Sequence, residues 1–203
     1  MFARSESHTR RIARLVGTVA LGAAILISGS PMALAGQPTC FGRAPTIIGD
    51  EGSERIRGTS GRDVIVGRGG DDIILAGGGN DLVCGKSGRD VIRGGSGDDL
   101  LSGNRGRDRI IGVGGNDLIR GGRRNDWLNV GRNESGNDHV IGGLGDDVLR
   151  AGRGADRLLG NDGDDLLAEG QADARRDLFS GGLGTDTCRA GAEDRLRSCE
   201  IKS

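Results

Sequence analysis

The stretch GGSGDDLLSG, residues 94–103, combines a glycine-rich turn, two adjacent carboxylates and a short aliphatic run. The same arrangement returns nine residues earlier and nine residues later. Written in rows of nine from Gly49, the chain forms fifteen rows, interrupted by three extra residues at 130–132 and three more at 169–171. A short fixed period of this kind indicates a solenoid, in which each repeat adds one unit to a stack.

Four columns of these rows carry the pattern. Column one is mostly glycine, and column four is glycine in every row except those of Arg124 and Arg175. Column eight is apolar in every row, from Ile56 to Cys188. Column six is Glu54 in the first row and aspartate in all others. These aspartates are Asp63, Asp72, Asp81, Asp90, Asp99, Asp108, Asp117, Asp126, Asp138, Asp147, Asp156, Asp165, Asp177 and Asp186.

The columns predict a local structure. Columns seven to nine are expected to form a strand of about three residues, roughly 10 Å long. Because side chains alternate along a strand, the apolar column eight faces inward and columns seven and nine face outward. Columns one to six turn the chain back, since glycine permits positive φ. Two rows then make one coil.

Stacking of such coils arranges the aspartates in two ladders. The first ladder holds Asp72, Asp90, Asp108, Asp126, Asp147, Asp165 and Asp186, and the second holds Asp63, Asp81, Asp99, Asp117, Asp138, Asp156 and Asp177. Neighbouring coils lie ~4.8 Å apart, so adjacent carboxylates repel by about 1 kcal/mol even in water. The ladders therefore disfavour the stack unless cations lie between the turns.

The chemistry of the turns favours calcium among the possible cations. Carboxylates and glycine carbonyls make an all-oxygen site, and no His or Cys recurs in the turns to suit zinc. Flexible, carbonyl-rich turns suit Ca²⁺ better than Mg²⁺, with expected dissociation constants of ~10⁻⁴–10⁻³ M. We therefore predict several Ca²⁺ ions, with metal ligands at Asp63, Asp72, Asp81, Asp90, Asp99, Asp108, Asp117, Asp126, Asp138, Asp147, Asp156 and Asp165.

At this point the chain resembles a known family. The row GGSGDDLLS matches the GGxGxDxUx nonapeptide of RTX calcium-binding proteins, and the resemblance covers residues 49–189. The closing stretch GGLGTDTCRAGAEDRLRSCE is similar to the end of small secreted bacterial calcium-binding repeat proteins. The resemblance implies an all-β fold, a right-handed parallel β-roll with short caps. It also implies a chain that is largely disordered without calcium.

Several rows depart from the family pattern. Column five, often Asn or Asp, is arginine at 62, 89, 107 and 176. Such an arginine either weakens the adjacent calcium site or forms a salt bridge to the ladder in place of an ion. Glu54, Arg124 and Arg175 also alter their own turns.

The first 35 residues have the features of an export signal. A basic start containing Arg10 and Arg11 precedes an apolar segment at 15–28, and cleavage is predicted after Ala35. An uncleaved membrane anchor and the twin-arginine route are the alternatives to general secretion. Cleavage would leave a net charge of about −4, which speaks against a nucleic-acid partner. We expect a secreted chain without a membrane span.

Four cysteines lie beyond the predicted cleavage site. An even number in an oxidising compartment indicates two disulfides among Cys40, Cys84, Cys188 and Cys199, for which three connectivities are open. A Cys40–Cys84 bond would pin the N-terminal segment 36–48 across the roll. Cys188 and Cys199 would likewise close the C-terminal segment 190–203.

The sequence also bears on function. No serine–histidine–acid set, metal–histidine pair or phosphate-binding glycine loop occurs, and His139 is the only histidine left after cleavage, so no enzymatic activity is expected. Two hypotheses remain: a free-standing secreted calcium-binding module, or an extracellular scaffold that binds a protein or carbohydrate and uses calcium structurally. Exposed aromatics or arginines along one face would favour the scaffold. Apolar column-seven residues, Val64, Leu82, Leu100 and Leu118, form a candidate docking patch.

Overall fold

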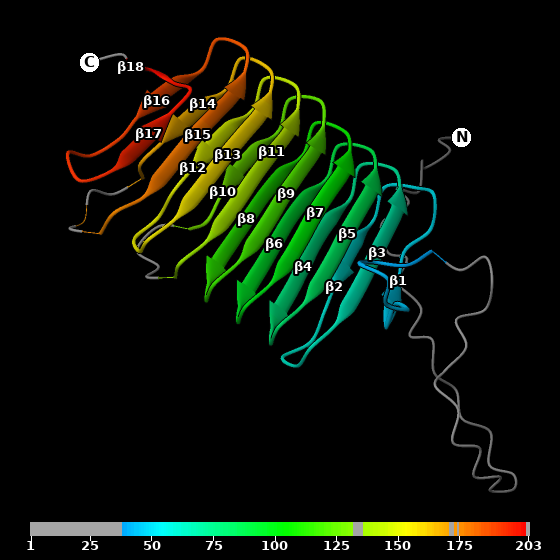
Figure 1. The fold of residues 1–203 in the computed structure, drawn as a ribbon. Coiled ribbons are helices and arrows are strands. Elements are labelled where there is room, and N and C mark those ends of the chain that lie inside the picture. Colours follow the sequence, from blue (N-terminus) through cyan, green and yellow to red (C-terminus); the bar gives the residue numbers. More distant parts are fainter. Residues whose placement is uncertain (1–37, 132–135, 171–172, 174, 202–203) are drawn as a thin grey trace, which may run out of the picture.

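The computed structural model describes residues 38–131, 136–170, 173 and 175–201, and these residues form a two-sheet parallel β-roll (Figure 1). Odd-numbered strands form one nine-stranded sheet and even-numbered strands form the other. The all-β parallel roll expected from the nonapeptide period is therefore confirmed. The predicted signal peptide and its cleavage site lie outside the described residues, among which no helix is long and apolar enough to span a membrane.

Each coil contributes one strand to each sheet. The first sheet contains β1 (Ile47–Ile48), β3 (Val64–Gly69), β5 (Leu82–Ser87), β7 (Leu100–Arg105), β9 (Leu118–Arg123), β11 (His139–Leu144), β13 (Arg157–Asp162), β15 (Leu178–Leu183) and β17 (Arg195–Arg197). The second contains β2 (Arg55–Arg57), β4 (Ile73–Gly78), β6 (Val91–Ser96), β8 (Arg109–Gly114), β10 (Trp127–Asn129), β12 (Val148–Arg150), β14 (Leu166–Ala168), β16 (Thr187–Arg189) and β18 (Glu200–Ile201).

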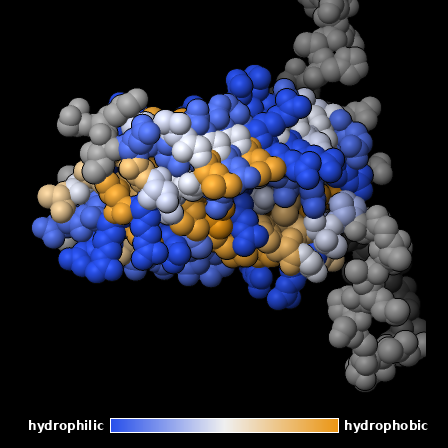
Figure 2. All heavy atoms as spheres, turned by 45° about the horizontal axis from the view of Figure 1, so that its top comes forward, coloured by the Kyte–Doolittle hydropathy of each residue, from blue (hydrophilic) through white to orange (hydrophobic). Residues whose placement is uncertain are grey.

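The core between the sheets is a double row of column-eight side chains. All of them, from Ile56 to Cys188, are buried, as the alternation of side chains predicts. Ile47 of β1 extends the row by one residue before the first repeat. Each coil thus adds only two large apolar side chains to the core, and Figure 2 shows that further apolar side chains lie on the outer surface, bordered by hydrophilic ones.

Strand length differs from the sequence expectation. Only β2, β10, β12, β14, β16 and β17 have three residues, whereas ten strands have six and continue through columns one to three. In β5 and β7, for example, pairing continues from Cys84 with Ser102 to Lys86 with Asn104. The longer pairing is possible because column one lacks a bulky side chain between neighbouring coils.

The extra residues also lie elsewhere than expected. Val130 is buried in the core, and its carbonyl accepts the N–H of Val113 at 2.7 Å, so Val130 occupies column one of its row. Glu169 likewise continues the ladder, donating its N–H to the carbonyl of Arg189 at 2.9 Å. The placement of the insertions at 130–132 and 169–171 was therefore wrong. Sheet pairing is kept at Val130 and Glu169, and the segments that follow them include residues outside the described part.

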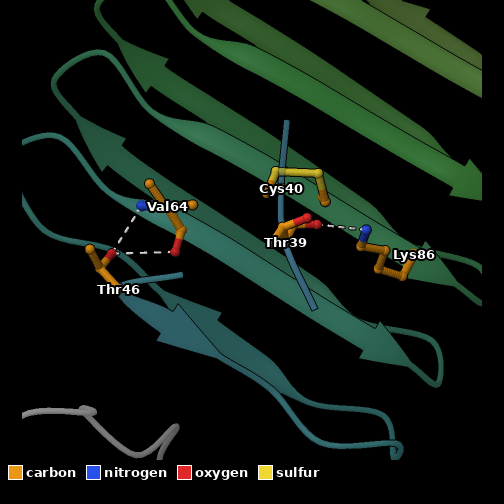
Figure 3. Close-up of a disulfide and its surroundings, with 6 residues drawn as sticks. Thr39, Cys40, Thr46, Val64 and Lys86 are labelled. Carbon is orange, nitrogen blue, oxygen red and sulfur yellow. Dashed lines mark hydrogen bonds between the residues drawn. A yellow bond between two sulfur atoms is a disulfide. The ribbon is translucent and has the colours of Figure 1, made fainter. Parts of the chain in front are cut away.

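A disulfide lies near each end of the roll, and the first of the two lies in a small apolar cluster of its own. Cys40 is bonded to Cys84, and Cys188 to Cys199, which settles the connectivity that the sequence left open. Beside the first bond, Lys86 Nζ donates to the carbonyl of Thr39 at 2.8 Å (Figure 3).

The N-terminal segment covers part of the candidate docking patch. Cys40 and Phe41 pack in one cluster with Val64, Leu82 and Leu100, on the outer face of the first sheet. The apolar column-seven residues of β3, β5 and β7 therefore have a partner within the chain.

Candidate metal centre

Both predicted aspartate ladders are present, and hydrogen bonds hold each of them together. Except for Asp186 at the end of the first ladder, the backbone N–H of each column-six residue donates to Oδ1 of the aspartate one coil further on. Asp90 donates to Asp108 at 2.8 Å, and Asp108 to Asp126 at 2.7 Å. All fourteen column-six aspartates are buried. One carboxylate oxygen of each is thus engaged in joining neighbouring coils.

The second oxygen, Oδ2, is left without a partner in most of these carboxylates. A buried oxygen that carries negative charge and lacks a hydrogen-bond donor is unfavourable. The structure therefore offers a series of buried carboxylate oxygens that are free to bind a cation. They belong to Asp72, Asp81, Asp90, Asp99, Asp108, Asp126, Asp147, Asp165 and Asp186.

The conformation of the turn explains which oxygens are free. In one kind of turn, which we call open, the preceding strand has six residues and includes column two. The column-two residue then has a positive φ, as in Lys86 (84°) or Asn104 (76°). That conformation directs the column-two N–H away from the carboxylate of the same turn. The open turns are those of Asp72, Asp81, Asp90, Asp99, Asp108, Asp117, Asp126, Asp147, Asp165 and Asp186.

In a closed turn, the column-two N–H satisfies Oδ2 within the turn itself. Thr59 donates to Asp63 Oδ2 at 2.7 Å, and Gly152 donates to Asp156 Oδ2 at 3.0 Å. Each of these turns follows a three-residue strand, β2 or β12. A cation should therefore stabilise a carboxylate in a closed turn less than one in an open turn.

The two ladders differ in their share of open turns. Every aspartate of the first ladder lies in an open turn, whereas the second ladder has open turns only at Asp81, Asp99 and Asp117. Both insertions precede aspartates of the second ladder, Asp138 and Asp177. The first ladder, whose turns form the upper edge in Figure 1, is thus the longer uninterrupted series of candidate sites.

Burial and like charges make these carboxylates reluctant to ionise. Burial, and then the charge of Asp90, raise the pKa of Asp108 to about 7, although the N–H of Asp90 lowers it. Burial and the charges of Asp108 and Asp147 raise the pKa of Asp126 to about 8. The pKa of Asp99 in the second ladder is raised by burial and by its neighbours to about 7. A divalent cation beside these groups would reverse the unfavourable electrostatics.

Backbone carbonyls would have to complete any cation site. Among the described residues, no three His, Cys, Asp or Glu side chains gather closely enough to hold a metal by themselves. A methyl group built on Gly94 would contact Asp99 Oδ2 and lie 2.9 Å from the carbonyl oxygen of Gly112 in the next coil. A free carboxylate oxygen and a carbonyl therefore border one small space, and this donor set fits a hard cation such as Ca²⁺.

The arginines in the turns do not neutralise the ladders. In the described part of the chain, no ion pair joins Arg62, Arg89, Arg107 or Arg176 to a column-six aspartate. The turns of Asp90 and Asp108 are open although Arg89 and Arg107 precede these aspartates. Arg124 takes the left-handed conformation of the glycine that it replaces, with φ of 79°.

The structure extends the two ladders of predicted ligands by three residues, of which only Asp186 has a free carboxylate oxygen. Asp177 and Asp186 continue the ladders beyond Asp165, and Asp186 has a free Oδ2. Asp194 accepts the N–H of Asp177 and ends the second ladder. Column six already identified Asp177 and Asp186, but Asp194 lies in a degenerate row.

Three predicted ligands and the lone histidine lie in other surroundings. Asp63 and Asp156 lie in closed turns, and the turn of Asp138 contains the first insertion. His139 lies on the outer side of β11, where burial, followed by Arg157 and Arg120, lowers its pKa.

Comparison with known families agrees with this geometry. A model of the RTX calcium-binding nonapeptide repeat matches residues 48–83, 85–119, 111–133, 133–167 and 171–195. These segments cover most of the roll. A search of curated proteins finds no match to the chain.

Proposed function

Because this chain belongs to the family built from RTX calcium-binding nonapeptide repeats, we propose that it binds several Ca²⁺ ions in its open turns and folds fully only when they bind. The observation that carries this proposal is the series of buried Oδ2 atoms without hydrogen-bond partners. Each of them is a carboxylate ligand that the protein leaves unsatisfied.

The residues of each open turn have separate tasks in this proposal. Oδ2 supplies the charged ligand, Oδ1 fixes the carboxylate to the next coil, and the carbonyls of the glycine turn supply neutral ligands. Bound Ca²⁺ supplies the positive charge that two stacked carboxylates lack. The first ladder, with open turns throughout, is expected to hold more ions than the second.

Coupling of folding to binding follows from the small core. One buried aliphatic side chain per nonapeptide does little to offset the conformational entropy lost by a glycine-rich backbone. The buried carboxylates add an electrostatic cost at neutral pH. Calcium binding is the favourable contribution that stabilises the stack.

We further propose that the protein acts outside the cell and is not an enzyme. Two disulfides suit an oxidising compartment. Calcium concentrations outside cells suit sites with dissociation constants of ~10⁻⁴–10⁻³ M. The repetition of the carboxylates along the roll supports a structural role for them rather than a single catalytic centre.

Two triple variants test where the ions bind. Asp90→Asn, Asp108→Asn and Asp126→Asn remove three adjacent carboxylates from open turns of the first ladder. Asp63→Asn, Asp156→Asn and Asp177→Asn make the same change of charge outside the open turns. Equilibrium dialysis against ⁴⁵Ca²⁺ should show that the first variant loses at least two ions and the second at most one. Equal losses, or no calcium binding by the unmodified protein, would contradict the proposal.

A further inference from the structure

A basic groove of about 850 Å³ lies beside the middle of the first ladder. It is lined by three successive turns, which follow β5, β7 and β9. Five exposed arginines dominate the lining: Arg89, Arg105, Arg107, Arg123 and Arg124. Ser87, Gly88, Gly106 and Asn125 complete it.

The roll brings these arginines together in two files. In the column-three file, Ser87 pairs with Arg105 and Arg105 with Arg123. In the column-five file, Arg89 and Arg107 occupy equivalent places in neighbouring coils, since Asp90 and Asp108, which follow them, are hydrogen-bonded to each other. Because neighbouring coils lie ~4.8 Å apart, Arg105 lies beside Arg123 and Arg89 lies beside Arg107. Both pairs bring like charges together, which disfavours the folded state.

No ion pair within the described chain neutralises these guanidinium groups directly. The column-five file is acidic on both sides of the groove, at Asp71 before Arg89 and at Asp146 and Asp164 after Asn125. The basic groove is therefore confined to three coils, a length of roughly 10 Å along the roll.

We propose that this groove binds a short anionic oligosaccharide that carries sulfate or carboxylate groups. Guanidinium groups bind such oxyanions through paired hydrogen bonds, and five of them supply more positive charge than a single anion needs. Ser87 and the neighbouring glycine backbone offer neutral polar groups for sugar hydroxyls.

The same surroundings argue against a nucleic acid as the ligand. No aromatic side chain lines the groove, so no base can stack there. The acidic residues on either side would repel the phosphates of a strand longer than the groove. The ligand that fits between them is therefore a short one.

Binding of a sulfated chondroitin tetrasaccharide to the calcium-loaded protein tests the proposal. Isothermal titration calorimetry should show saturable binding of the tetrasaccharide, and no binding of its desulfated and carboxyl-reduced form. Inorganic sulfate at the same sulfate concentration serves to separate a site for an oligosaccharide from one for a simple anion. A single-stranded oligonucleotide of equal charge serves as the nucleic-acid probe.

Matched variants distinguish binding in the groove from attraction to the overall positive charge of the arginines. Arg105→Gln, Arg107→Gln and Arg123→Gln should weaken tetrasaccharide binding at least tenfold. Arg62→Gln, Arg153→Gln and Arg176→Gln remove equal charge from exposed turn positions of the second ladder and should change the affinity less than twofold. Circular dichroism in calcium verifies that both variants fold, so that this test is independent of the calcium sites.

Three results would overturn the inference. One is the absence of tetrasaccharide binding by the unmodified, calcium-loaded protein. Another is equal weakening in both triple variants. The third is binding of inorganic sulfate or of the oligonucleotide at least as tight as that of the tetrasaccharide.

Discussion

At the residue scale, each column-six carboxylate has one oxygen that joins two coils and a second whose partner depends on the turn. In Asp108, Oδ1 accepts the N–H of Asp90 while Oδ2 is buried without a partner. In Asp156, Oδ2 accepts the N–H of Gly152. The same amino acid in the same column therefore has different chemistry in the two kinds of turn.

Asp108→Asn should have opposite effects with and without calcium. The carboxamide keeps the acceptor for Asp90 but removes a ligand charge, so calcium affinity at this turn should fall roughly tenfold, about 1.4 kcal/mol. In EDTA the variant should be at least as stable as the unmodified chain, because it removes a buried charge. The fraction of β-structure, measured by far-UV circular dichroism, gives the sign in EDTA, and the melting temperature in saturating calcium gives the sign with the metal.

Asp156→Asn is the matched control for this prediction. Because Oδ2 of Asp156 is already hydrogen-bonded in its turn, its replacement should lower the melting temperature in saturating calcium less than Asp108→Asn does. Equal changes would mean that the open and closed turns do not differ in calcium binding.

At the scale of the elements, the turn is the unit that makes the roll possible. Gly106 has φ of 151°, and a methyl group there would clash with the carbonyl oxygen of Gly88 in the preceding coil. Gly61 occupies the same column in a closed turn, where the nearest atom to such a methyl group is Thr59 Oγ1 at 3.9 Å. Glycine in column four is thus required at one position and not at the other.

Gly106→Ala should therefore lower the free energy of unfolding by about 2 kcal/mol or more, because the backbone has to move away from the added methyl group. Gly61→Ala should be neutral or stabilising by up to about 1 kcal/mol. Urea unfolding in saturating calcium compares the two, and a similar loss in both would contradict the proposed difference between the turns.

The limits of sequence-based prediction are also clearest at this scale. Column eight predicted the core and column six predicted both ladders, because each column keeps one type of side chain in every coil. The choice between open and closed turns was not visible, since AGRGAD (151–156) and GRGGDD (67–72) have nearly the same pattern. In the second ladder, the closed turn of Asp156 lies between the two turns that contain insertions. These three turns become neighbours only when the coils stack, so the local sequence does not show the contact.

The placement of the insertions failed for a related reason. In the sequence, the extra residues were placed at the first position that breaks the nonapeptide pattern. That position is Val130, where column one is usually glycine. In the roll, Val130 fills a core position, so burial of its side chain keeps the register of the sheet.

At the scale of the whole molecule, the ladders make the metal-free roll sensitive to pH. The pKa of Asp72, Asp108 and Asp147 is raised to about 7 by burial above all, well above the value of ~3.9 in an unfolded chain. The folded state therefore binds these protons more tightly than the unfolded state does. The stability that these groups contribute is fully present below pH ~4 and is lost progressively as pH rises through about 7.

In EDTA, the chain should accordingly contain more β-structure at pH 5 than at pH 8, as measured by far-UV circular dichroism. With calcium the order should reverse, because protons compete with the cation for the same carboxylates. Metal-free β-structure that is independent of pH would show that the ladder carboxylates do not control the stability of the roll.

The central claim is that calcium in the turns converts a chain with a small core into a stable roll. Its most direct test is far-UV circular dichroism of residues 36–203 in EDTA at pH 7.5, followed by titration with Ca²⁺ and, separately, with Mg²⁺. The account predicts a largely disordered spectrum in EDTA and a cooperative change to β-structure with Ca²⁺ alone. A spectrum already rich in β-structure in EDTA, and unchanged by calcium, would contradict it.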